Sequence, residues 1–295
     1  MSTVKHQMRP KKPKKTLNQT NSHRNKPDKT TLASKTGLTT LPDNAVKARS
    51  GLLLYGYHSV IAALSNVQRD PIQLFATEEA ADKLHTVSTQ PLPPITCLSR
   101  TQLAQMLKSK QSEQAILPHQ GLILHTKPLD QPDLSDLVNL LHSGKPHRRF
   151  LILDQVTDPR NIGAILRSAR AFGTDAIILT SRHAPDETGA LAKAAAGALE
   201  DVPLVRVNNL ARALATLKEH FVTLAGLEAT APTNINQLAT TTHLGLIMGS
   251  EGSGLRRLTR EACDIMTSID MAESSESLNV SVAAAIALYA TQFQG

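Results

Sequence analysis

The chain has 295 residues, of which 41% are hydrophobic and 3% aromatic, and its formal net charge is +7. This length predicts about two domains, and the distant Cys97 and Cys263 indicate neither a disulfide scaffold nor a zinc site. No run approaches the ~20 apolar residues of a membrane span, and no apolar signal-peptide core is found near the start. We therefore expect a cytoplasmic protein that binds neither a membrane nor a metal.

The positive charge is concentrated at the start of the chain. Residues 1–50 contain twelve Lys or Arg and two Asp or Glu, a balance of +10, so the remainder carries 7 − 10 = −3. Residues 1–48 hold too few large apolar side chains to offset the entropy of ordering, which predicts a disordered basic tail. Such a tail suggests a polyanionic partner, most simply nucleic acid; the alternative is a solvating tail without a specific partner.

Residues 52–127 are predicted to form a small α/β domain. Strands are expected at 72–76, 95–98 and 121–126, and helices at 60–66, 78–87 and 101–107, the last capped by Ser99 or Thr101. His119 stands just before the last strand, where composition favours an ordinary loop residue over a functional one. Residues 128–149 are predicted to be a proline-punctuated linker with one short helix at 134–142.

From residue 150 onwards, strands and helices alternate regularly. Strands are expected at 150–154, 176–180, 203–207, 221–226, 244–248 and 265–269, and helices at 162–172, 189–198, 209–219 and 278–292. This pattern predicts a mostly parallel sheet with helices on both faces. In such sheets ligands bind outside the carboxyl ends of the strands.

Three polar clusters each follow a predicted strand, so all three should lie at the same edge of the sheet. The first is Asn161, Gly163 and Arg167, on the first turns of a helix that Asp158 or Asn161 caps. An amide and a guanidinium in this place suggest a polar or anionic substrate. The alternative is a capping Asn, a small packing Gly and a solvated Arg.

The second and third clusters lie in the last third of the chain. The sequence GSEGSG at 249–254 lacks the Lys-Ser/Thr of a phosphate-binding loop, but its glycines allow close approach to a ligand. Glu251 either orients a bound group there or occupies an exposed turn. The sequence SLNVS at 277–281 opens the last helix, where Ser277 or Asn279 is the cap and free N–H groups are available.

These clusters resemble the motifs of a known family. N-x-G-x-x-x-R at 161–167, I-M-G-S-E-G-x-G at 247–254 and S-L-N-V-S-V-A at 277–283 are similar to the three motifs of the SpoU (TrmH) family of RNA ribose 2′-O-methyltransferases. The resemblance covers about residues 150–295, and within the family it is strongest to bacterial members that methylate a guanosine ribose in 23S ribosomal RNA. Residues 52–127 resemble, less strongly, that family's small N-terminal RNA-binding domain.

The resemblance implies a fold, a cofactor and an assembly. It implies that 150–295 is a methyltransferase domain with a C-terminal trefoil knot, although knots are rare in proteins. It implies S-adenosylmethionine, bound in the knot by backbone groups near Gly226, Gly249, Ile269 and Leu278. It also implies a homodimer in which Arg167 of one subunit can serve the site of the other.

The roles of the remaining motif residues are also implied by the resemblance. Because a guanidinium normally stays protonated, Arg167 is expected to stabilise a developing ribose alkoxide and to hold the adjacent phosphate; a base role is the alternative. Asn161 and Glu251 are expected to orient Arg167 and the ribose, and Ser277 and Asn279 to position the nucleotide. The scarcity of aromatic residues predicts RNA recognition through phosphates and shape.

Two other functions remain open at this point. One is a tRNA ribose methyltransferase of the same family, which the additional N-terminal domain and the lack of an extension after the last helix disfavour. The other is a non-catalytic RNA-binding protein on the same scaffold. The joint presence of Arg167, Glu251 and Asn279 argues against it, because binding alone does not need all three motifs.

Overall fold

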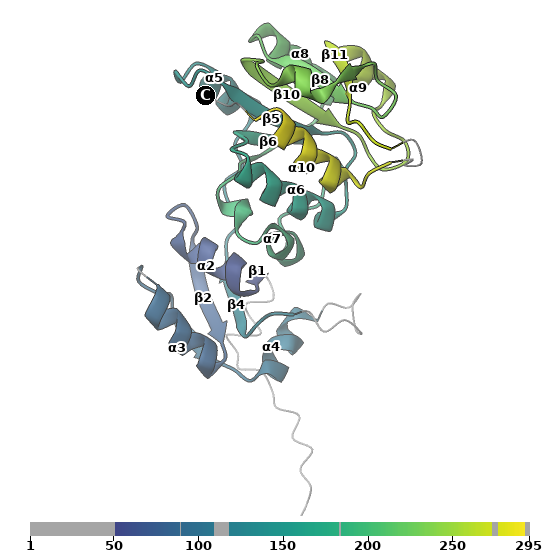
Figure 1. The fold of residues 1–295 in the computed structure, drawn as a ribbon. Coiled ribbons are helices and arrows are strands. Elements are labelled where there is room, and N and C mark those ends of the chain that lie inside the picture. Colours follow the sequence, from purple (N-terminus) through teal and green to yellow (C-terminus); the bar gives the residue numbers. More distant parts are fainter. Residues whose placement is uncertain (1–50, 89, 109–117, 183, 273–276, 293–295) are drawn as a thin grey trace, which may run out of the picture. The chain divides into compact units, whose positions relative to one another are not determined.

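The computed structural model describes residues 51–88, 90–108, 118–182, 184–272 and 277–292. The predicted basic tail lies outside these residues. The described residues form two sheets, one of four strands and one of seven (Figure 1). None of the helices among them is long and apolar enough to cross a membrane.

The four-stranded sheet has the order β1-β4-β2-β3, with β4 antiparallel to both β1 and β2 and β2 parallel to β3. Its elements are β1 (Leu52–Tyr55), α2 (Tyr57–Ser65), β2 (Pro71–Ala76), α3 (Glu78–Val87), β3 (Ile95–Cys97), α4 (Arg100–Leu107) and β4 (Leu122–Thr126). The predicted α/β alternation is confirmed, and Ser99 caps α4 in a capping box with Gln102. The short strand β1 was not predicted.

The seven-stranded sheet has the order β7-β6-β5-β10-β8-β11-β9, and every strand pair in it is parallel. Its strands are β5 (Arg148–Leu153), β6 (Ala176–Thr180), β7 (Leu204–Val207), β8 (Thr223–Leu227), β9 (Thr233–Asn234), β10 (His243–Met248) and β11 (Ile265–Ser268). Its helices are α5 (Leu134–Leu141), α6 (Pro159–Ala171), α7 (Gly189–Ala195), α8 (Leu210–Glu219), α9 (Arg257–Ala262) and α10 (Val280–Ala290), with short 3₁₀ helices η2 (Ala198–Glu200) and η3 (Ile235–Leu238).

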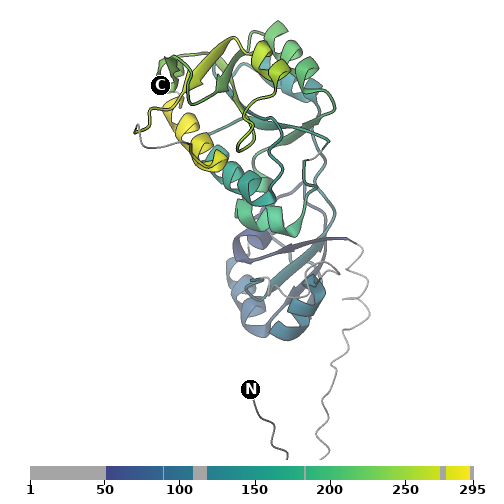
Figure 2. The ribbon, with the colours of Figure 1, turned by 90° about the vertical axis from the view of Figure 1, so that its right-hand side faces the viewer.

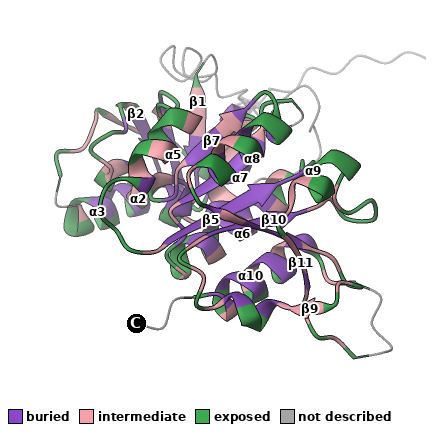
Figure 3. Ribbon diagram, turned by 90° about the horizontal axis from the view of Figure 1, so that it is seen from above, coloured by how far each residue is buried: buried purple, intermediate pink, exposed green. Residues whose placement is uncertain are grey.

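Helices cover both faces of this sheet, as predicted (Figures 1 and 2). Alternate residues of β5 enter two different cores: Leu151 packs with α6, α7 and α10, whereas Phe150 packs with α5 and α8. Both faces of β5 and β10 are buried (Figure 3), which explains why these strands are apolar runs without alternation.

The predicted helix at 189–198 is shorter than expected. It ends at Ala195, because Ala196 has φ 48° and Gly197 has φ 92°, and this left-handed backbone cannot continue an α-helix. Two further elements, the two-residue strand β9 and the charged helix α9, were not predicted.

A buried ion network joins the α2–β2 connection to the region around α7. The Arg69 side chain is fully buried and lies 2.6 Å from a carboxylate oxygen of Glu187 and 2.6 Å from one of Glu200. The Ser59 hydroxyl donates to the carbonyl of Ala192 over 2.9 Å nearby. These charged and polar contacts add to an apolar core that the small sheet shares with the seven-stranded part, where Leu54 and Leu191 belong to the same buried cluster.

Candidate functional site

The three sequence clusters meet at the carboxyl edge of the seven-stranded sheet. Asn161 lies in the first turn of α6 after β5, Glu251 in the loop after β10, and Asn279 at the start of α10. The Asn279 amide donates to Glu251 Oε1 over 2.5 Å and to Asn161 Oδ1 over 3.2 Å. The Asn161 amide donates to the same Glu251 oxygen over 3.4 Å. The prediction of a common edge is therefore confirmed.

Local capping explains how Asn161 and Asn279 reach the carboxylate. Asp158, not Asn161, caps α6 by accepting from the Arg160 N–H over 2.8 Å, which leaves the Asn161 amide to bind elsewhere. Asn279 caps α10 with its oxygen, which accepts from the Ser281 N–H over 2.9 Å, while its amide nitrogen faces Glu251. The Asn279 side chain thus caps the start of α10 and also binds the Glu251 carboxylate.

Glu251 is an oriented carboxylate. Its Oε1 also accepts from the N–H of Val280 over 3.2 Å, so three donors fix one oxygen. No donor among the described residues reaches the second oxygen, Oε2, and Glu251 lines a cavity. Neutral donors hold the charge in place without neutralising it, so Oε2 can accept from a group inside that cavity.

The cavity beside Glu251 has a volume of about 750 Å³. Its walls come from residues 248–255, from the end of β8 at Leu227, and from the start of α10, with Ser277 and Leu278 among the lining residues. A side cavity of about 140 Å³ shares Leu227, Ser277 and Leu278 and extends to Ile269. Six of the predicted site residues therefore lie on this cavity or its extension: Gly249, Glu251, Ile269, Ser277, Leu278 and Asn279.

The glycine loop turns back on itself to form one wall. The Gly254 N–H donates to the Ser250 carbonyl over 3.0 Å. A Cβ atom on Gly249 would lie 2.2 Å from the Gly254 carbonyl carbon, so a side chain cannot be accommodated there without moving backbone. Gly249 thus lines the cavity and also allows the loop to close.

Two predicted glycines serve packing and do not line the cavity. A Cβ on Gly226 would meet the sulfurs of Cys263 and Met266, each at 2.8 Å. A Cβ on Gly163 would lie 2.3 Å from the Cβ of Ala194, where α6 packs against α7. The packing alternative for Gly163 is therefore correct, and the structure gives Gly226 a packing function.

Arg167 does not reach the cavity of its own chain. It lies on α6, exposed, and does not line the cavity that Glu251 and Asn279 border. Neither an ion pair nor a side-chain hydrogen bond joins it to any residue that the structure describes. The predicted catalytic set is thus brought together without its guanidinium.

Asp154 is a site residue that the sequence reasoning missed. It is fully buried directly after β5, and its carboxylate accepts from the Arg256 backbone N–H over 3.1 Å and from the Arg256 guanidinium over 2.6 Å. This pair fixes the end of the glycine loop to β5. An acidic residue ending the apolar run LILD was the signal that could have revealed it.

His119 has a structural role in the turn before β4. Its Nδ1 accepts from the Gly121 N–H over 3.1 Å, and burial lowers the pKa of the imidazole. It therefore supports the turn before β4, as the loop alternative expected. Across the described ranges, no group of three or more His, Cys, Asp or Glu side chains is arranged to hold a metal ion.

Sequence comparison identifies relatives over most of the chain. The 23S rRNA (guanosine-2′-O-)-methyltransferase RlmB of Escherichia coli K12 is 40% identical over 243 residues, which cover 80% of this chain and 96% of the relative. The protein of the same name from Coxiella burnetii is 37% identical over 245 residues, covering 82% and 95%.

Structure comparison finds the same fold in more distant proteins. The SpoU methyltransferase AviRb from Streptomyces viridochromogenes, solved in complex with AdoMet, superimposes with a TM-score of 0.67 at 20% identity, covering 85% of this chain and 97% of AviRb. The sequence model of the SpoU rRNA Methylase family matches residues 148–289, which contain all three motifs. Together with the identity to the curated relatives, this match shows that the chain belongs to the SpoU rRNA methylase family.

Proposed function

We propose that this protein uses S-adenosylmethionine to methylate the 2′-hydroxyl of a guanosine ribose in 23S ribosomal RNA. The observation that carries the proposal is the hydrogen-bonded cluster of Asn161, Glu251 and Asn279, of which Glu251 and Asn279 line a glycine-walled cavity. The relatives named as 23S rRNA guanosine methyltransferases, which align with 80% or more of the chain, support the substrate. Such a substrate places the enzyme in the cytoplasm.

The residues of the cavity fit the cofactor. Leu227, Leu278 and Ala283 offer apolar surface for an adenine ring, and the loop at 249–254 offers backbone groups at close range. Ile269 and Leu278 border the side cavity, which extends the space available. If bound there, S-adenosylmethionine would supply an electrophilic methyl group on its sulfonium sulfur, and that sulfur would be the leaving group when the methyl carbon bonds to the ribose oxygen.

The chain's own residues then prepare the ribose. Glu251 Oε2 accepts a hydrogen bond from the ribose, and the amides of Asn161 and Asn279 keep the carboxylate in that orientation. Ser277, exposed on the cavity wall, contacts the nucleotide. Pre-orientation of this kind lowers the entropic cost of reaching the transition state.

Arg167 is proposed to act across a dimer interface. It stabilises the negative charge that develops on the ribose 2′-oxygen as the hydroxyl proton passes to solvent, and it holds the adjacent phosphate. Since Arg167 is exposed and lies away from its own cavity, a partner subunit is the source of the guanidinium for each site. The exposed apolar side chains of α10, which packs against α6, support such an interface.

The domain organisation and the knot belong to the same proposal. The domains are residues 52–127 for RNA substrate binding, 128–149 as a linker and 150–295 for catalysis, preceded by a basic tail at 1–48 that contacts RNA phosphates. A trefoil knot in the catalytic domain agrees with the contact of Val280, at the start of the last helix, with the loop after β10. Neither a metal nor a membrane has a part in this mechanism.

The proposal is tested by single-turnover methyl transfer to 23S rRNA transcribed without modifications. Wild-type protein should methylate one guanosine ribose, identified by mass spectrometry of nuclease fragments. Glu251→Gln, which keeps the shape but not the charge, should lower the rate on the order of 10²-fold, as expected for loss of a positioned charged group. Glu219→Gln, an exposed carboxylate on α8, is the matched control and should retain the wild-type rate.

Three results would contradict the proposal. Methylation of a base would exclude ribose chemistry, and methylation of tRNA but not of 23S rRNA would favour the tRNA enzyme. Retention of wild-type turnover by Glu251→Gln would remove the carboxylate from the mechanism. Calorimetry should in addition show S-adenosylmethionine binding to the wild-type protein without added metal.

A further inference from the structure

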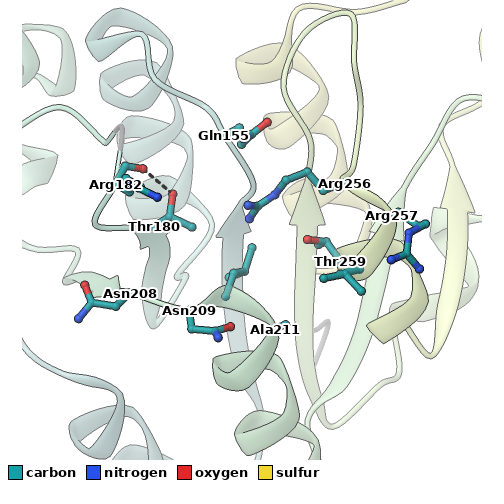
Figure 4. Close-up of a pocket in the computed structure, with 11 residues that line it drawn as sticks. Gln155, Thr180, Arg182, Asn208, Asn209, Ala211, Arg256, Arg257 and Thr259 are labelled. Atoms are coloured by element: carbon teal, nitrogen blue, oxygen red, sulfur yellow. Dashed lines mark hydrogen bonds between the residues drawn. The ribbon is translucent and has the colours of Figure 1, made fainter.

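A second cavity lies at the same edge of the sheet as the catalytic one. It has a volume of about 620 Å³ and is formed where β5, β6 and β7 end, with the segment 256–259 as its opposite wall. Figure 4 shows Gln155, Thr180 and Asn208 in this cavity, each just after or at the end of a different strand, and Arg256 on the opposite wall. None of the sequence motifs contributes to this cavity.

The rim of the cavity is cationic. Arg182, Arg256 and Arg257 line it, whereas no Asp or Glu is found among its described lining residues. This distribution stands out because the chain after residue 50 has a net charge of −3. A cavity that carries three arginines on a mildly acidic body is suited to an anion.

The three arginines differ in their availability. The Arg256 guanidinium is bound to the buried Asp154, and Arg257 pairs with Glu261 over 2.7 Å at the surface. Arg182 is exposed, and in the described part of the chain no carboxylate pairs with it. Its planar guanidinium can therefore form two parallel hydrogen bonds with a phosphate.

Other groups in the cavity suit the rest of a nucleotide. The amides of Asn208 and Gln155 can donate to or accept from base edges and ribose hydroxyls, the groups by which proteins recognise single-stranded RNA. Leu258, 57% exposed, offers apolar surface to a base or a sugar. Gln155 has a φ of 62°, a conformation that costs energy for a residue other than glycine.

The second cavity is adjacent to the catalytic one along the chain. The loop that begins at Gly249 lines the catalytic cavity up to Leu255, and the next residue, Arg256, lines the second cavity. On the other side, Gln155 lies in the connection between β5 and α6, six residues before Asn161. An RNA strand that places one ribose beside Glu251 therefore extends over a neighbouring cavity that is already cationic.

We infer that the cavity bordered by Arg182, Arg256 and Asn208 binds the RNA backbone and one nucleotide next to the methylated one. This inference rests on the proposed function and deepens it, because it assigns substrate positioning to residues outside the family motifs. Arg182 supplies the phosphate contact, and Asn208 and Gln155 contact the nucleotide. Arg256, which is bound to Asp154, fixes the position of the segment that separates the two cavities.

The test uses the full chain and unmodified 23S rRNA transcripts. Arg182→Ala should raise the KM for RNA about tenfold while kcat at saturating RNA stays near that of the wild type, as expected for loss of one charged contact made to the bound substrate. The slope of log Kd against log salt should decrease by about 0.7, the value for one lost phosphate contact in a single strand. Arg182→Lys should retain most of the slope, and Arg182→Glu should bind more weakly than Arg182→Ala.

The matched control is Lys218→Ala. It also removes one positive charge, but from the C-terminal end of α8, whereas the cavity is lined by the N-terminal end of that helix; Lys218 pairs there with Asp264. It should leave KM and the salt slope unchanged. Wild-type KM and slope in Arg182→Ala, with an unchanged melting temperature, would overturn the inference while the proposed function stands. If the wild type does not methylate 23S rRNA, the proposed function fails, and the salt slope with the same RNA still decides whether Arg182 binds phosphate. If Arg182→Ala weakened the binding of free mononucleotides but not of RNA, the cavity would be a small-molecule site, and this result would also overturn the inference.

Discussion

The two cysteines differ in environment, and this difference predicts their reactivity. Burial, with a smaller contribution from the neighbouring Asp264, raises the pKa of the Cys263 thiol to about 11, and its sulfur lies 3.3 Å from the Thr259 carbonyl. At pH 8 only about 10⁻³ of Cys263 is then thiolate, the reactive form. Iodoacetamide should modify Cys97, which is exposed, and leave Cys263 unmodified in the folded protein. Mass spectrometry after labelling checks this prediction, with labelling in guanidinium as the control in which both react. Equal labelling of both thiols in the folded state would contradict it.

The residues of the site were predictable where a strand end places them. Asn161, Glu251 and Asn279 each follow a strand, and parallel strands bring such positions to one edge whatever the details of packing. The sequence could not show why positions 226 and 163 require glycine. The side chains that leave no room for a Cβ there, Met266 beside Gly226 and Ala194 beside Gly163, come from distant segments. Capping was ambiguous for the same reason: Asp158 and Asn161 are both suitable caps, and only the position of Glu251 shows which one is otherwise engaged.

At the scale of elements, the buried ion network predicts a large effect on stability. Arg69→Met leaves the carboxylates of Glu187 and Glu200, with side chains only 6% and 4% exposed, without their cation. Removal of one partner from a buried ion pair typically costs about 3–5 kcal/mol. The free energy of unfolding, measured by urea titration, should fall by that order.

Arg100→Met is the matched control. Arg100 is 75% exposed and lies 3.6 Å from Glu79, so solvent screens this pair and its loss should barely change the free energy of unfolding. Adding Glu187→Gln and Glu200→Gln to Arg69→Met should recover part of the loss, because the uncompensated charges are then removed. A loss below about 1 kcal/mol in Arg69→Met alone would show that water or another group compensates the two carboxylates.

Long apolar strands and helices with clear periodicity were predicted with small errors at their ends. The strands β5 and β10 are buried on both faces, so their composition alone identifies them. The early end of α7 was missed because Ala196, a good helix former, adopts φ 48° in the folded chain. The elements β1 and β9 were missed because four and two residues are too few to show a period, and their hydrogen bonds come from strands far away in the sequence.

At the scale of the whole molecule, the surface of α10 predicts that two copies associate. Val282, Ile286 and Tyr289 follow helical spacing and are 46%, 37% and 66% exposed, while the opposite face of α10 is buried in the core. A helix that is apolar on all sides is normally covered. Ile286→Glu should therefore convert a dimer into a monomer, as measured by light scattering during size-exclusion chromatography. Phe221→Glu, which alters an 88% exposed side chain outside α10, should leave the mass unchanged, and a monomeric wild-type protein would exclude the proposed dimer.

The last prediction combines the dimer with the position of Arg167. If Arg167 of one subunit completes the cavity of the other, Arg167→Ala and Glu251→Gln should complement each other when the two variants are unfolded and refolded together. A heterodimer then contains one cavity with an intact Glu251 that receives an intact Arg167, and one cavity with both defects. Random pairing of equal amounts gives half heterodimers with one working site in two, so about a quarter of the wild-type methyl transfer should return. If Arg167 serves its own chain, every site carries one defect and the mixture stays as inactive as the separate variants. The same mixture made with Ile286→Glu in both chains should show no recovery, because complementation requires the interface.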